Sequence, residues 1–449
     1  MTPNLFFRSL LKEEDVMERT LANQVNRSTG RRVKLQGWLH NLRKQGQVNF
    51  LILRDRTGMI QAVASPEAIK DLQGLQMESI LEIEGTVVEA PPAPGGYELQ
   101  EIKISVINPV TDAAPFNFHQ KEFNANLPYF LDHATIGQRF PRQRAVLKLA
   151  ALAAEGFRKT LQTLDFIEIF SPKIVAGATE SGANVFQLDY FGQPAFLAQS
   201  PQFYKQIMVG VFERVFEVAP VFRAEKFDTA RHLNEYLSLD AEMGFVENHF
   251  SVMDMVSAVM RGMLKSIKEN FPAEDQKLLG MEFPSVPDPI PWIYYPEAQE
   301  LIHRRYGIDA RGEPDLAPEH EKAIGRWARE EHGSDFVFVS GYPMVKRPFY
   351  THPNPEDPKF SNSFDLLFRG MELVTGGQRL HRYNDYVEAL QKAGCPLEPL
   401  REYLECFRFG MPPHGGFAIG LERFVAQLCQ LDNVKWVTLF PRDINRLRP

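Results

Sequence analysis

The sequence predicts an α+β fold in which a small all-β domain precedes a larger domain of mixed strands and helices. Two observations lead to this prediction. Residues 33–107 alternate apolar and polar side chains in short runs, which is typical of antiparallel strands. Beyond residue 140, apolar residues recur at helical spacing and then in strand-like runs. With 449 residues, the chain is long enough for two or three domains that each bury a core.

The first strand-rich segment is expected to close into a barrel of about five strands. Gly37, Gly46 and Gly58 interrupt the alternation and mark the corners. A barrel of this size fits the OB-fold, which often binds single-stranded nucleic acid, and an SH3-like barrel is the alternative. Residues 1–60 hold 11 Lys and Arg against 5 Asp and Glu, although the net charge of the chain is −7. This local excess favours contact with phosphates, and a solvated basic surface is the alternative.

Residues 113–140 follow neither period and contain proline and asparagine, so we expect a hinge there. This hinge divides the chain into a domain over residues 1–112 and a domain over residues 141–449.

The second domain is expected to begin with an amphipathic helix over Arg144–Leu161, because apolar residues recur three or four positions apart. A strand beginning at Phe166 follows and ends at Pro172. The methionine-rich run at residues 251–267 is expected to form a helix whose methionines pack in the core.

Composition excludes several classes of protein. No apolar run reaches the roughly 18 residues of a membrane span. Acidic residues 13–15 directly follow a short apolar patch, which does not fit a secretion signal, so we expect a cytoplasmic protein. Cys395, Cys406 and Cys429 form no CxxC pair, which argues against a disulfide framework and a structural zinc site.

A first group of charged residues alternates with apolar ones between Val221 and Phe245. Arg223 and Glu225 would share one face of a strand, and Asp240 and Glu242 the same face of the returning strand. Two cross-strand ion pairs on a solvated face are the structural alternative. The other face must be buried, however, because its residues are apolar. The connecting loop adds Lys226, Arg231 and His232 above the charges, which favours a pocket for a polar ligand.

A second group lies in "SFDLLFRGMELVTGGQRLH", where Asp365 and Glu372 belong to a predicted strand-turn-strand unit. Two carboxylates at one site suggest Mg²⁺ that bridges phosphates, while ordinary surface charge is the alternative. Gly376 and Gly377 would allow close approach of a ligand to the backbone, and Arg379 follows them.

A third group begins with the glycines of "MPPHGGFAIGLERF", which precede an apolar-periodic helix. Glu422 and Arg423 lie in the first turn of this helix. An arginine beside a glycine-rich helix start can hold a terminal phosphate, although the glycine spacing alone is weak evidence.

In this order, the segments resemble the class II aminoacyl-tRNA synthetases. "FIEIFSPKI" is similar to motif 1, "FRAE…RHLNE…LDAEM" to motif 2 and "GLERF" to motif 3. The resemblance covers the whole chain and is strongest to archaeal- and eukaryotic-type aspartyl enzymes, since the chain has no room for the extra domain of the bacterial type. It implies an OB-fold anticodon domain, a catalytic domain with an antiparallel sheet flanked by helices, and a homodimer whose interface includes Pro172.

The resemblance also implies formation of an adenylate from ATP and an amino acid, followed by transfer to tRNA. Arg223 would contact the α-phosphate, and Arg423 would hold the far end of a bent ATP. Asp365 and Glu372 would hold Mg²⁺. The remaining residues that it assigns to ATP are Glu225, Arg231 and His232, with His232 or Phe227 covering the adenine.

Amino-acid choice follows from "AQSPQFYKQ", which resembles the aspartyl pattern and contains Gln199, Ser200, Gln202 and Lys205. By resemblance, Lys205 and Arg379 would pair with the aspartate side chain, and Asp240 would offset their charge. Glu180 would meet the α-amino group. Bound asparagine would leave the two cations without an anion, which favours aspartate over asparagine.

In the barrel, Phe50, Gln61 and Arg43 match the family positions that contact the anticodon, with barrel core as the alternative for Phe50. His40 and Pro94 replace a tryptophan and a lysine that are common in strictly aspartyl-specific enzymes. The pattern resembles the non-discriminating subgroup, which charges both tRNA-Asp and tRNA-Asn and depends on an amidotransferase.

The alternatives are a strictly discriminating aspartyl enzyme, an asparaginyl enzyme and a non-catalytic paralogue that only binds tRNA. Intact Arg223, Asp365, Glu372 and Arg423 argue against the last of these. An asparagine-synthesising paralogue is a further alternative, but such relatives generally lack the barrel.

Overall fold

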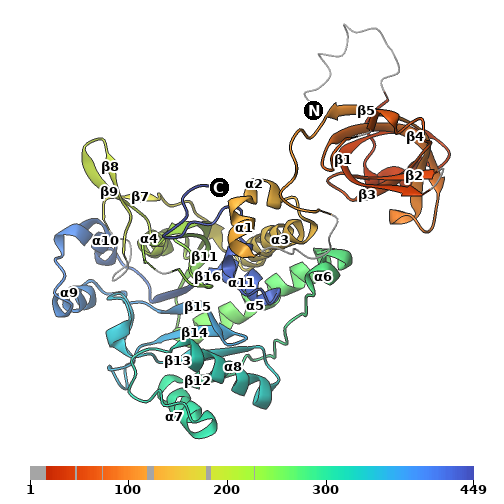
Figure 1. Cartoon of the computed structure of the whole chain (residues 1–449). Coiled ribbons are helices and arrows are strands. Elements are labelled where there is room, and N and C mark those ends of the chain that lie inside the picture. The colour runs from red at the N-terminus through yellow and green to blue at the C-terminus, as the bar shows by residue number, and fades with distance from the viewer. Residues whose placement is uncertain (1–16, 46–47, 73, 119–125, 178–183, 227) are drawn as a thin grey trace. The chain divides into compact units, whose positions relative to one another are not determined.

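The computed structural model describes residues 17–45, 48–72, 74–118, 126–177, 184–226 and 228–449. It divides into two compact units, Met1–Asn124 and Ala125–Pro449 (Figure 1). The predicted α+β class, with a β-barrel ahead of a sheet flanked by helices, is confirmed. The finer division into residues 1–112, 113–140 and 141–449 stays a prediction.

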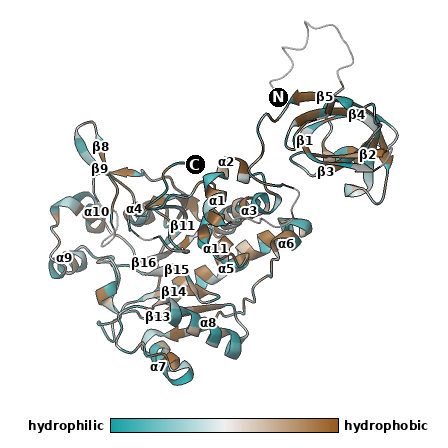
Figure 2. Ribbon diagram, in the orientation of Figure 1, coloured by the Kyte–Doolittle hydropathy of each residue, from teal (hydrophilic) through white to brown (hydrophobic). Residues whose placement is uncertain are grey.

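The first unit is a closed barrel whose strands follow the order β1-β2-β3-β5-β4. Along β4, half-buried and buried residues alternate, as expected for a strand with one face toward a core. Figure 2 shows the same alternation of hydrophobic and hydrophilic segments in the barrel strands. The strands are β1 (Arg32–Gln45), β2 (Val48–Arg54), β3 (Met59–Ala64), β4 (Ile80–Glu89) and β5 (Tyr97–Asn108).

The second unit is built on an eight-stranded sheet with the order β12-β13-β14-β15-β16-β11-β10-β6. Neighbouring strands are antiparallel except for the pairs β10·β6 and β12·β13. The strands are β6 (Ile167–Glu168), β10 (Arg214–Phe222), β11 (Glu235–Gly244), β12 (Trp292–Tyr294), β13 (Phe336–Ser340), β14 (Ser363–Phe368), β15 (Met371–Gln378) and β16 (His414–Gly420).

Helices α3 (Pro141–Thr163), α5 (His249–Asn270) and α11 (Leu421–Leu428) share one hydrophobic core with the sheet. The helices predicted around Arg144–Leu161 and in the methionine-rich run are thus confirmed. Met253, Met260 and Met263 are buried in this core, as expected.

The remaining elements surround this sheet. Helices α7 (Tyr295–Tyr306) and α8 (Pro318–His332) share a second core with β13. A third cluster joins α4 (Gln202–Phe212), α9 (Tyr383–Lys392) and α10 (Arg401–Glu405). A small sheet pairs β7 (Ile174–Val175) and β8 (Gln187–Tyr190) with β9 (Gln193–Leu197).

Two local expectations differ from the structure. Within the expected hinge, α1 (Leu127–Asp132) and α2 (Ala134–Gly137) form, because Asn126 caps the first helix and Pro128 occupies its first turn. Helices this short show no period in a sequence. The strand expected from Phe166 is reduced to the two residues of β6. No helix in the described part of the chain is long and apolar enough to cross a membrane.

The packing of α3 against α5 gives a stability prediction. A Cβ at Gly262 would lie 2.2 Å from Thr160 Oγ1, and Thr160 has little rotamer freedom. We expect Gly262→Leu to lower the free energy of unfolding by about 1–3 kcal/mol through overpacking, measured by urea denaturation. Gly177→Leu is the matched control, since nothing lies within 4 Å of a Cβ there. Equal stability of the two variants would contradict this account.

Candidate active site

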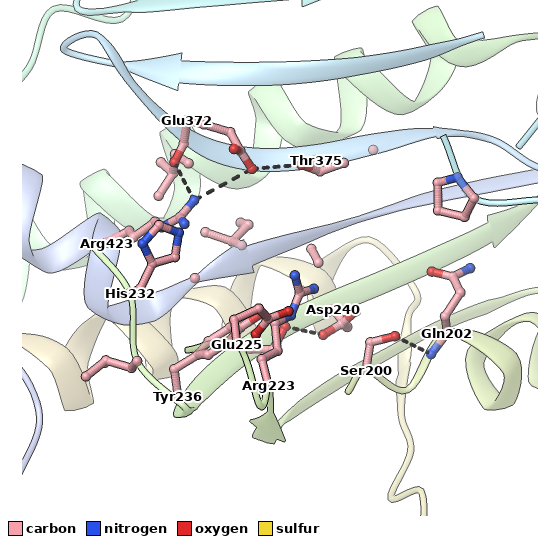
Figure 3. A pocket seen from close by; sticks show the side chains of 18 of the residues that line it. Ser200, Gln202, Arg223, Glu225, His232, Tyr236, Asp240, Glu372, Thr375 and Arg423 are labelled. Carbon is pink, nitrogen blue, oxygen red and sulfur yellow. Dashed lines mark hydrogen bonds and ion pairs between the residues drawn. The ribbon is translucent and has the colours of Figure 1, made fainter. Parts of the chain in front are cut away.

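A cavity of about 590 Å³ lies in the second unit, at the strands β11, β16 and β15 (Figure 3). It brings together most of the residues that the sequence singled out. Those that line it are Gln202, Lys205, Arg223, Glu225, Arg231, His232, Asp240, Glu372, Arg379 and Arg423, with Ser200 beside them. Glu180 and Phe227 lie outside the described residues.

Strand alternation on β11 explains one wall of this cavity. Leu239, Ala241 and Met243 belong to the hydrophobic core. Asp240 and Glu242 therefore project from the opposite face of the sheet, as predicted. The first strand of this hairpin differs from the prediction, because β10 ends at Phe222, before Arg223 and Glu225.

The segment that carries Arg223 and Glu225 is held by Asn234 instead of by a strand ladder. Arg223 N donates to Asn234 O at 2.9 Å. The Asn234 side-chain amide donates to the carbonyl oxygens of Arg223 and Glu225, at 2.6 and 3.0 Å. These bonds fix the backbone at the point where both side chains enter the cavity.

One end of the cavity is strongly charged and centres on Arg423 and Glu372 (Figure 3). Arg423 Nη1 lies 3.6 Å from Glu372 Oε1 and donates to the Glu372 carbonyl oxygen at 3.1 Å. Thr375 Oγ1 donates to Glu372 Oε1 at 3.0 Å. Although burial opposes it, the charge of Arg423 and the Thr375 hydrogen bond lower the pKa of Glu372. This end therefore offers a cation and an ionised carboxylate side by side.

Glu321 on α8 binds Arg231 and the backbone of Glu372 at this end of the cavity. The sequence did not predict a role for it. It accepts from Arg231 Nη1 at 2.9 and 3.2 Å and from the backbone N–H of Glu372 at 3.1 Å. Burial raises the pKa of Glu321 to about 6. No local signal marks it, because it lies on an ordinary amphipathic helix far from the three charged groups in sequence.

His232 is uncharged near neutral pH. Burial, followed by the charges of Arg423 and Arg231, lowers the pKa of His232 to about 4. A neutral imidazole at this place can lie against a flat ring without repelling the neighbouring cations.

The two carboxylates expected to hold a metal occupy different positions. Glu372 lines the cavity, whereas Asp365 lies outside its lining, 3.1 Å from Arg347 Nη2. Burial raises the pKa of Asp365 to about 6. Thr375, which the sequence analysis did not select, supplies the second oxygen facing the cavity beside Glu372. Within the described ranges, no cluster of three or more His, Cys, Asp or Glu could hold a metal ion.

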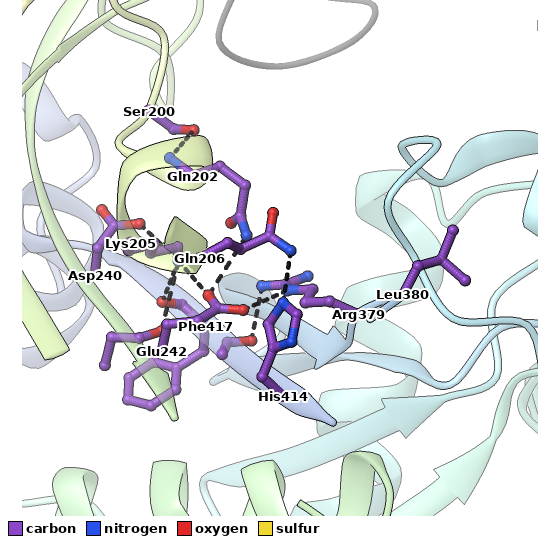
Figure 4. Close-up of polar contacts among 12 residues, drawn as sticks. Ser200, Gln202, Lys205, Gln206, Asp240, Glu242, Arg379, Leu380, His414 and Phe417 are labelled. Atoms are coloured by element: carbon purple, nitrogen blue, oxygen red, sulfur yellow. Dashed lines mark hydrogen bonds and ion pairs between the residues drawn. The ribbon is translucent and has the colours of Figure 1, made fainter. Parts of the chain in front are cut away.

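Lys205 and Arg379 converge at the other end of the cavity, and they meet on Glu242 (Figure 4). Lys205 Nζ lies 3.2 Å from Glu242 Oε2 and 3.1 Å from Asp240 Oδ1. Arg379 Nε donates to Glu242 Oε1 at 2.9 Å. Glu242 is fully buried, and although burial opposes it, the charges of Arg379 and Lys205 lower its pKa. Strand alternation predicted Glu242 on this face, but no sequence pattern indicated its role.

This arrangement corrects the expectation that bound asparagine would leave Lys205 and Arg379 without an anion. Two buried cations and the carboxylates of Asp240 and Glu242 balance each other before any ligand binds. A ligand without a carboxylate would therefore not leave the cations unpaired.

Position 416 requires a glycine, because the Glu242 carboxylate packs closely against it. A Cβ at Gly416 would lie 2.1 Å from Glu242 Oε2. Packing also requires the glycines at 376 and 377: a Cβ at Gly376 would lie 2.5 Å from Phe364, and one at Gly377 would lie 2.7 Å from Asn362 O. Gly376 also lines the cavity, and the approach of a ligand to its backbone stays a prediction.

The predicted helix that begins with the third group is α11, and Glu422 lies in its first turn. Both carboxylate oxygens of Glu422 accept from Leu237 N, at 3.0 and 3.2 Å. Burial raises the pKa of Glu422 to about 7. Glu422 thereby ties α11 to β11, and it places Arg423 at the cavity.

In the barrel unit, Arg43, Phe50 and Gln61 share the outer face. Arg43 pairs with Phe50 across β1 and β2, and Gln61 pairs with Ile52. Leu51, Ile60 and Ala62 fill the core from the other face, which excludes the barrel-core alternative for Phe50. His40 lies on β1, and Pro94 begins the short 3-10 helix Pro94–Gly96 between β4 and β5.

The raised pKa of Glu422 gives a pH-dependent stability prediction. The folded protein binds this proton more tightly than the unfolded chain, in which the ordinary pKa is 4.5. Stability from this group is therefore present below pH 4.5 and is lost as pH rises through about 7. We expect the free energy of unfolding, relative to that of Glu422→Gln, to fall by about 3 kcal/mol over this window. The prediction would be contradicted if the free energies of unfolding of the wild type and Glu422→Gln, measured by urea denaturation, changed with pH in parallel.

Comparison with known proteins agrees with both units. Residues 128–444 match the tRNA synthetases class II (D, K and N), and residues 33–107 match the OB-fold nucleic acid binding domain. An Aspartate--tRNA(Asp/Asn) ligase of Deinococcus radiodurans is 45% identical, with 96% of this chain and 99% of the relative covered. An Aspartate--tRNA(Asp) ligase of Pyrococcus horikoshii is 38% identical, with 94% and 97% covered.

The structure is also similar to that of asparaginyl-tRNA synthetase from Pyrococcus horikoshii complexed with asparaginyl-adenylate. The TM-score is 0.87 at 30% identity, and the match covers 96% of this chain and 100% of the other. Together these matches confirm the OB-fold barrel and the synthetase catalytic domain that the sequence predicted. Enzymes with this catalytic domain use ATP as a substrate. The chain belongs to the class II tRNA synthetases of the D, K and N group.

Proposed function

We propose that the protein joins aspartate to tRNA through an aspartyl-adenylate, and that it charges both tRNA-Asp and tRNA-Asn. The observation that carries this proposal is the meeting of Lys205 and Arg379 in a cavity whose opposite end holds Arg423 and Glu372. The similarity to an Aspartate--tRNA(Asp/Asn) ligase over nearly the whole chain supports it.

In the proposed first step, an aspartate α-carboxylate oxygen attacks the α-phosphorus of ATP, and pyrophosphate leaves. Arg223 stabilises the charge that develops on the α-phosphate, and Arg423 and Arg231 hold the far phosphates. Neutral His232 covers the adenine, and Glu225 completes the ATP contacts. In the second step, a hydroxyl of the terminal ribose of tRNA attacks the acyl carbon, and AMP leaves. Positioning and charge stabilisation suffice, and no covalent enzyme intermediate is needed.

The residues at the charged end fit Mg²⁺, which would neutralise phosphate charge when bound. This ion takes few protein ligands and prefers oxygen. Glu372 and Thr375 present such oxygens to the cavity. Asp365 lies behind them beside Arg347, so it would act on the ion through its charge or through water.

Selection of aspartate rests on the hydrogen-bond donors that Lys205 and Arg379 present. Both side chains donate and neither accepts, so an amide NH₂ in place of a carboxylate oxygen finds no partner on them. Asp240 and Glu242 hold the two donors in place, and Gln202 lines the same end. Glu180 would meet the α-amino group.

Several further parts of the proposal concern partners. Arg43, Phe50 and Gln61 form the anticodon contacts on the barrel, and His40 and Pro94 permit tRNA-Asn. An amidotransferase would then convert the aspartyl-tRNA-Asn that this enzyme produces. We place the enzyme in the cytoplasm. A homodimer is supported by exposed apolar side chains around Pro172: Phe170 is 83% exposed, Ile174 50% and Ile167 48%.

Charging of separate tRNA-Asp and tRNA-Asn transcripts tests the proposal directly. We expect aspartate to be attached to both, with aspartate-dependent exchange of pyrophosphate into ATP. Charging of tRNA-Asp alone would indicate a strictly discriminating enzyme, and activation of asparagine would indicate an asparaginyl enzyme. Absence of exchange with either amino acid would indicate a non-catalytic paralogue.

Loss of Arg223 should reduce adenylate formation. Replacing its planar guanidinium in Arg223→Lys should lower kcat for pyrophosphate exchange by about 10²-fold, because the transition state loses a preorganised donor. Arg304→Lys on the exposed surface of α7 is the matched control and should leave kcat unchanged. A similar kcat for both variants would remove Arg223 from the proposed mechanism.

The tolerance of tRNA-Asn is tested in the barrel. The double substitution of His40→Trp and Pro94→Lys should lower charging of tRNA-Asn relative to tRNA-Asp by about tenfold, since recognition of the anticodon becomes stricter. Pro92→Lys, at an exposed position in the same connection, is the control. An unchanged ratio would show that selectivity lies elsewhere.

A further inference from the structure

A polar network is buried next to Lys205 and Arg379, at the aromatic cluster of α4, α9 and α10. Figure 4 shows two of its members, Gln206 and His414, beside the two cations. Gln206 Nε2 lies 3.0 Å from Tyr386 Oη and 2.8 Å from His414 Nε2. Tyr403 Oη donates to Gln206 Oε1 at 2.8 Å. Gln206, Tyr386 and His414 have no exposed surface, and Tyr403 is 5% exposed. None of these residues contributes to the cavity lining.

The hydrogen bonds are consistent with one another when Tyr403 donates to Gln206, its shorter contact; Tyr403 Oη also lies 3.1 Å from Tyr386 Oη. Burial lowers the pKa of His414 to about 4, so the ring is neutral. His414 Nδ1 donates to Pro412 O at 2.9 Å, which leaves Nε2 as the acceptor for Gln206. The second Gln206 amide hydrogen goes to Tyr386 Oη, and Tyr386 donates to Leu380 O at 2.9 Å. Each polar group of the network thus has a partner.

The network joins the backbones that carry the two cations. Gln206 directly follows Lys205 on α4, and the Tyr386 hydroxyl binds the carbonyl oxygen of Leu380, which directly follows Arg379. Arg379 N donates to His414 O at 2.8 Å. Movement of any one of these segments would therefore change the separation of the Lys205 and Arg379 side chains.

We propose that the buried network of Gln206, His414, Tyr386 and Tyr403 sets the spacing of Lys205 and Arg379 and thereby determines the affinity for the aspartate side chain. These are positioning residues, since they act through the two cations. The proposal rests on the proposed aspartate-activating function. Buried polar networks of this kind fix one geometry because an unsatisfied member is costly. The alternative is a purely structural role, in which the network only satisfies the hydrogen bonds of polar groups buried in this aromatic cluster.

Removal of one hydroxyl tests the proposal. Tyr403→Phe leaves Gln206 Oε1 without its donor, so the KM for aspartate in pyrophosphate exchange should rise by about tenfold. The KM for ATP should stay unchanged, because the network does not reach the end of the cavity that holds Arg423 and Glu372. Tyr295→Phe is the matched control, since this buried hydroxyl donates to Glu313 O at 2.8 Å in a different core.

Tyr386→Phe provides a second variant that cuts the link to Leu380, and it should raise the KM for aspartate in the same way. For both variants, the shift in Tm caused by added aspartate should shrink, whereas the shift caused by ATP should not. A lower Tm with unchanged KM for aspartate, as for Tyr295→Phe, would overturn the proposal and leave a structural role. Failure of the wild-type protein to activate aspartate would instead overturn the proposed function.

Discussion

The fully buried carboxylate of Glu242 holds together the part of the structure on which recognition depends. It binds Lys205 from α4 and Arg379 from the end of β15, while itself projecting from β11. A charge in such a place is tolerated only with good partners, and removing one partner of a buried pair costs about 3–5 kcal/mol. Glu242 therefore fixes three segments relative to each other before any ligand is present. Gly416 belongs to the same constraint, because only a residue without Cβ leaves room for the carboxylate.

Sheet order explains why residues so distant in sequence meet at one cavity. Strands β15, β16 and β11 are neighbours. Arg379 directly follows β15, Arg423 lies in the first turn of the helix that follows β16, and Asp240 lies on β11. The helices of the main core lie against the opposite face, so the cavity face is free for polar groups. The cavity consequently has two ends of different chemistry. One combines Arg423, Glu372 and Thr375, and the other places two cations against two carboxylates.

Much of this site could be predicted because its residues occur in compact segments with a strand or helix period. Alternation alone placed Asp240 and Glu242 on one face, and the resemblance of the three motifs supplied the roles. Apart from Thr375, the residues that were missed support the site and do not line the cavity. Glu321 lies on a helix remote from the motifs, whereas Gln206 directly follows Lys205. Their partners, Arg231 and His414, become visible only when the chain is folded.

The sequence by itself determined the barrel, the helix-flanked sheet and the residues that face the cavity, because periodicity and motif spacing are local properties. Tertiary structure decided which acidic side chain neutralises which basic side chain. Asp365 pairs with Arg347 and lies outside the cavity lining, whereas Glu372 lines the cavity, and the role of Asp365 as a metal ligand stays a prediction. Asp240 was expected to offset the charge of Lys205 and Arg379, but Glu242, which had no predicted role, pairs with both cations. Such pairings depend on distances of a few ångströms between strands that are far apart in the chain, and no sequence pattern encodes those distances.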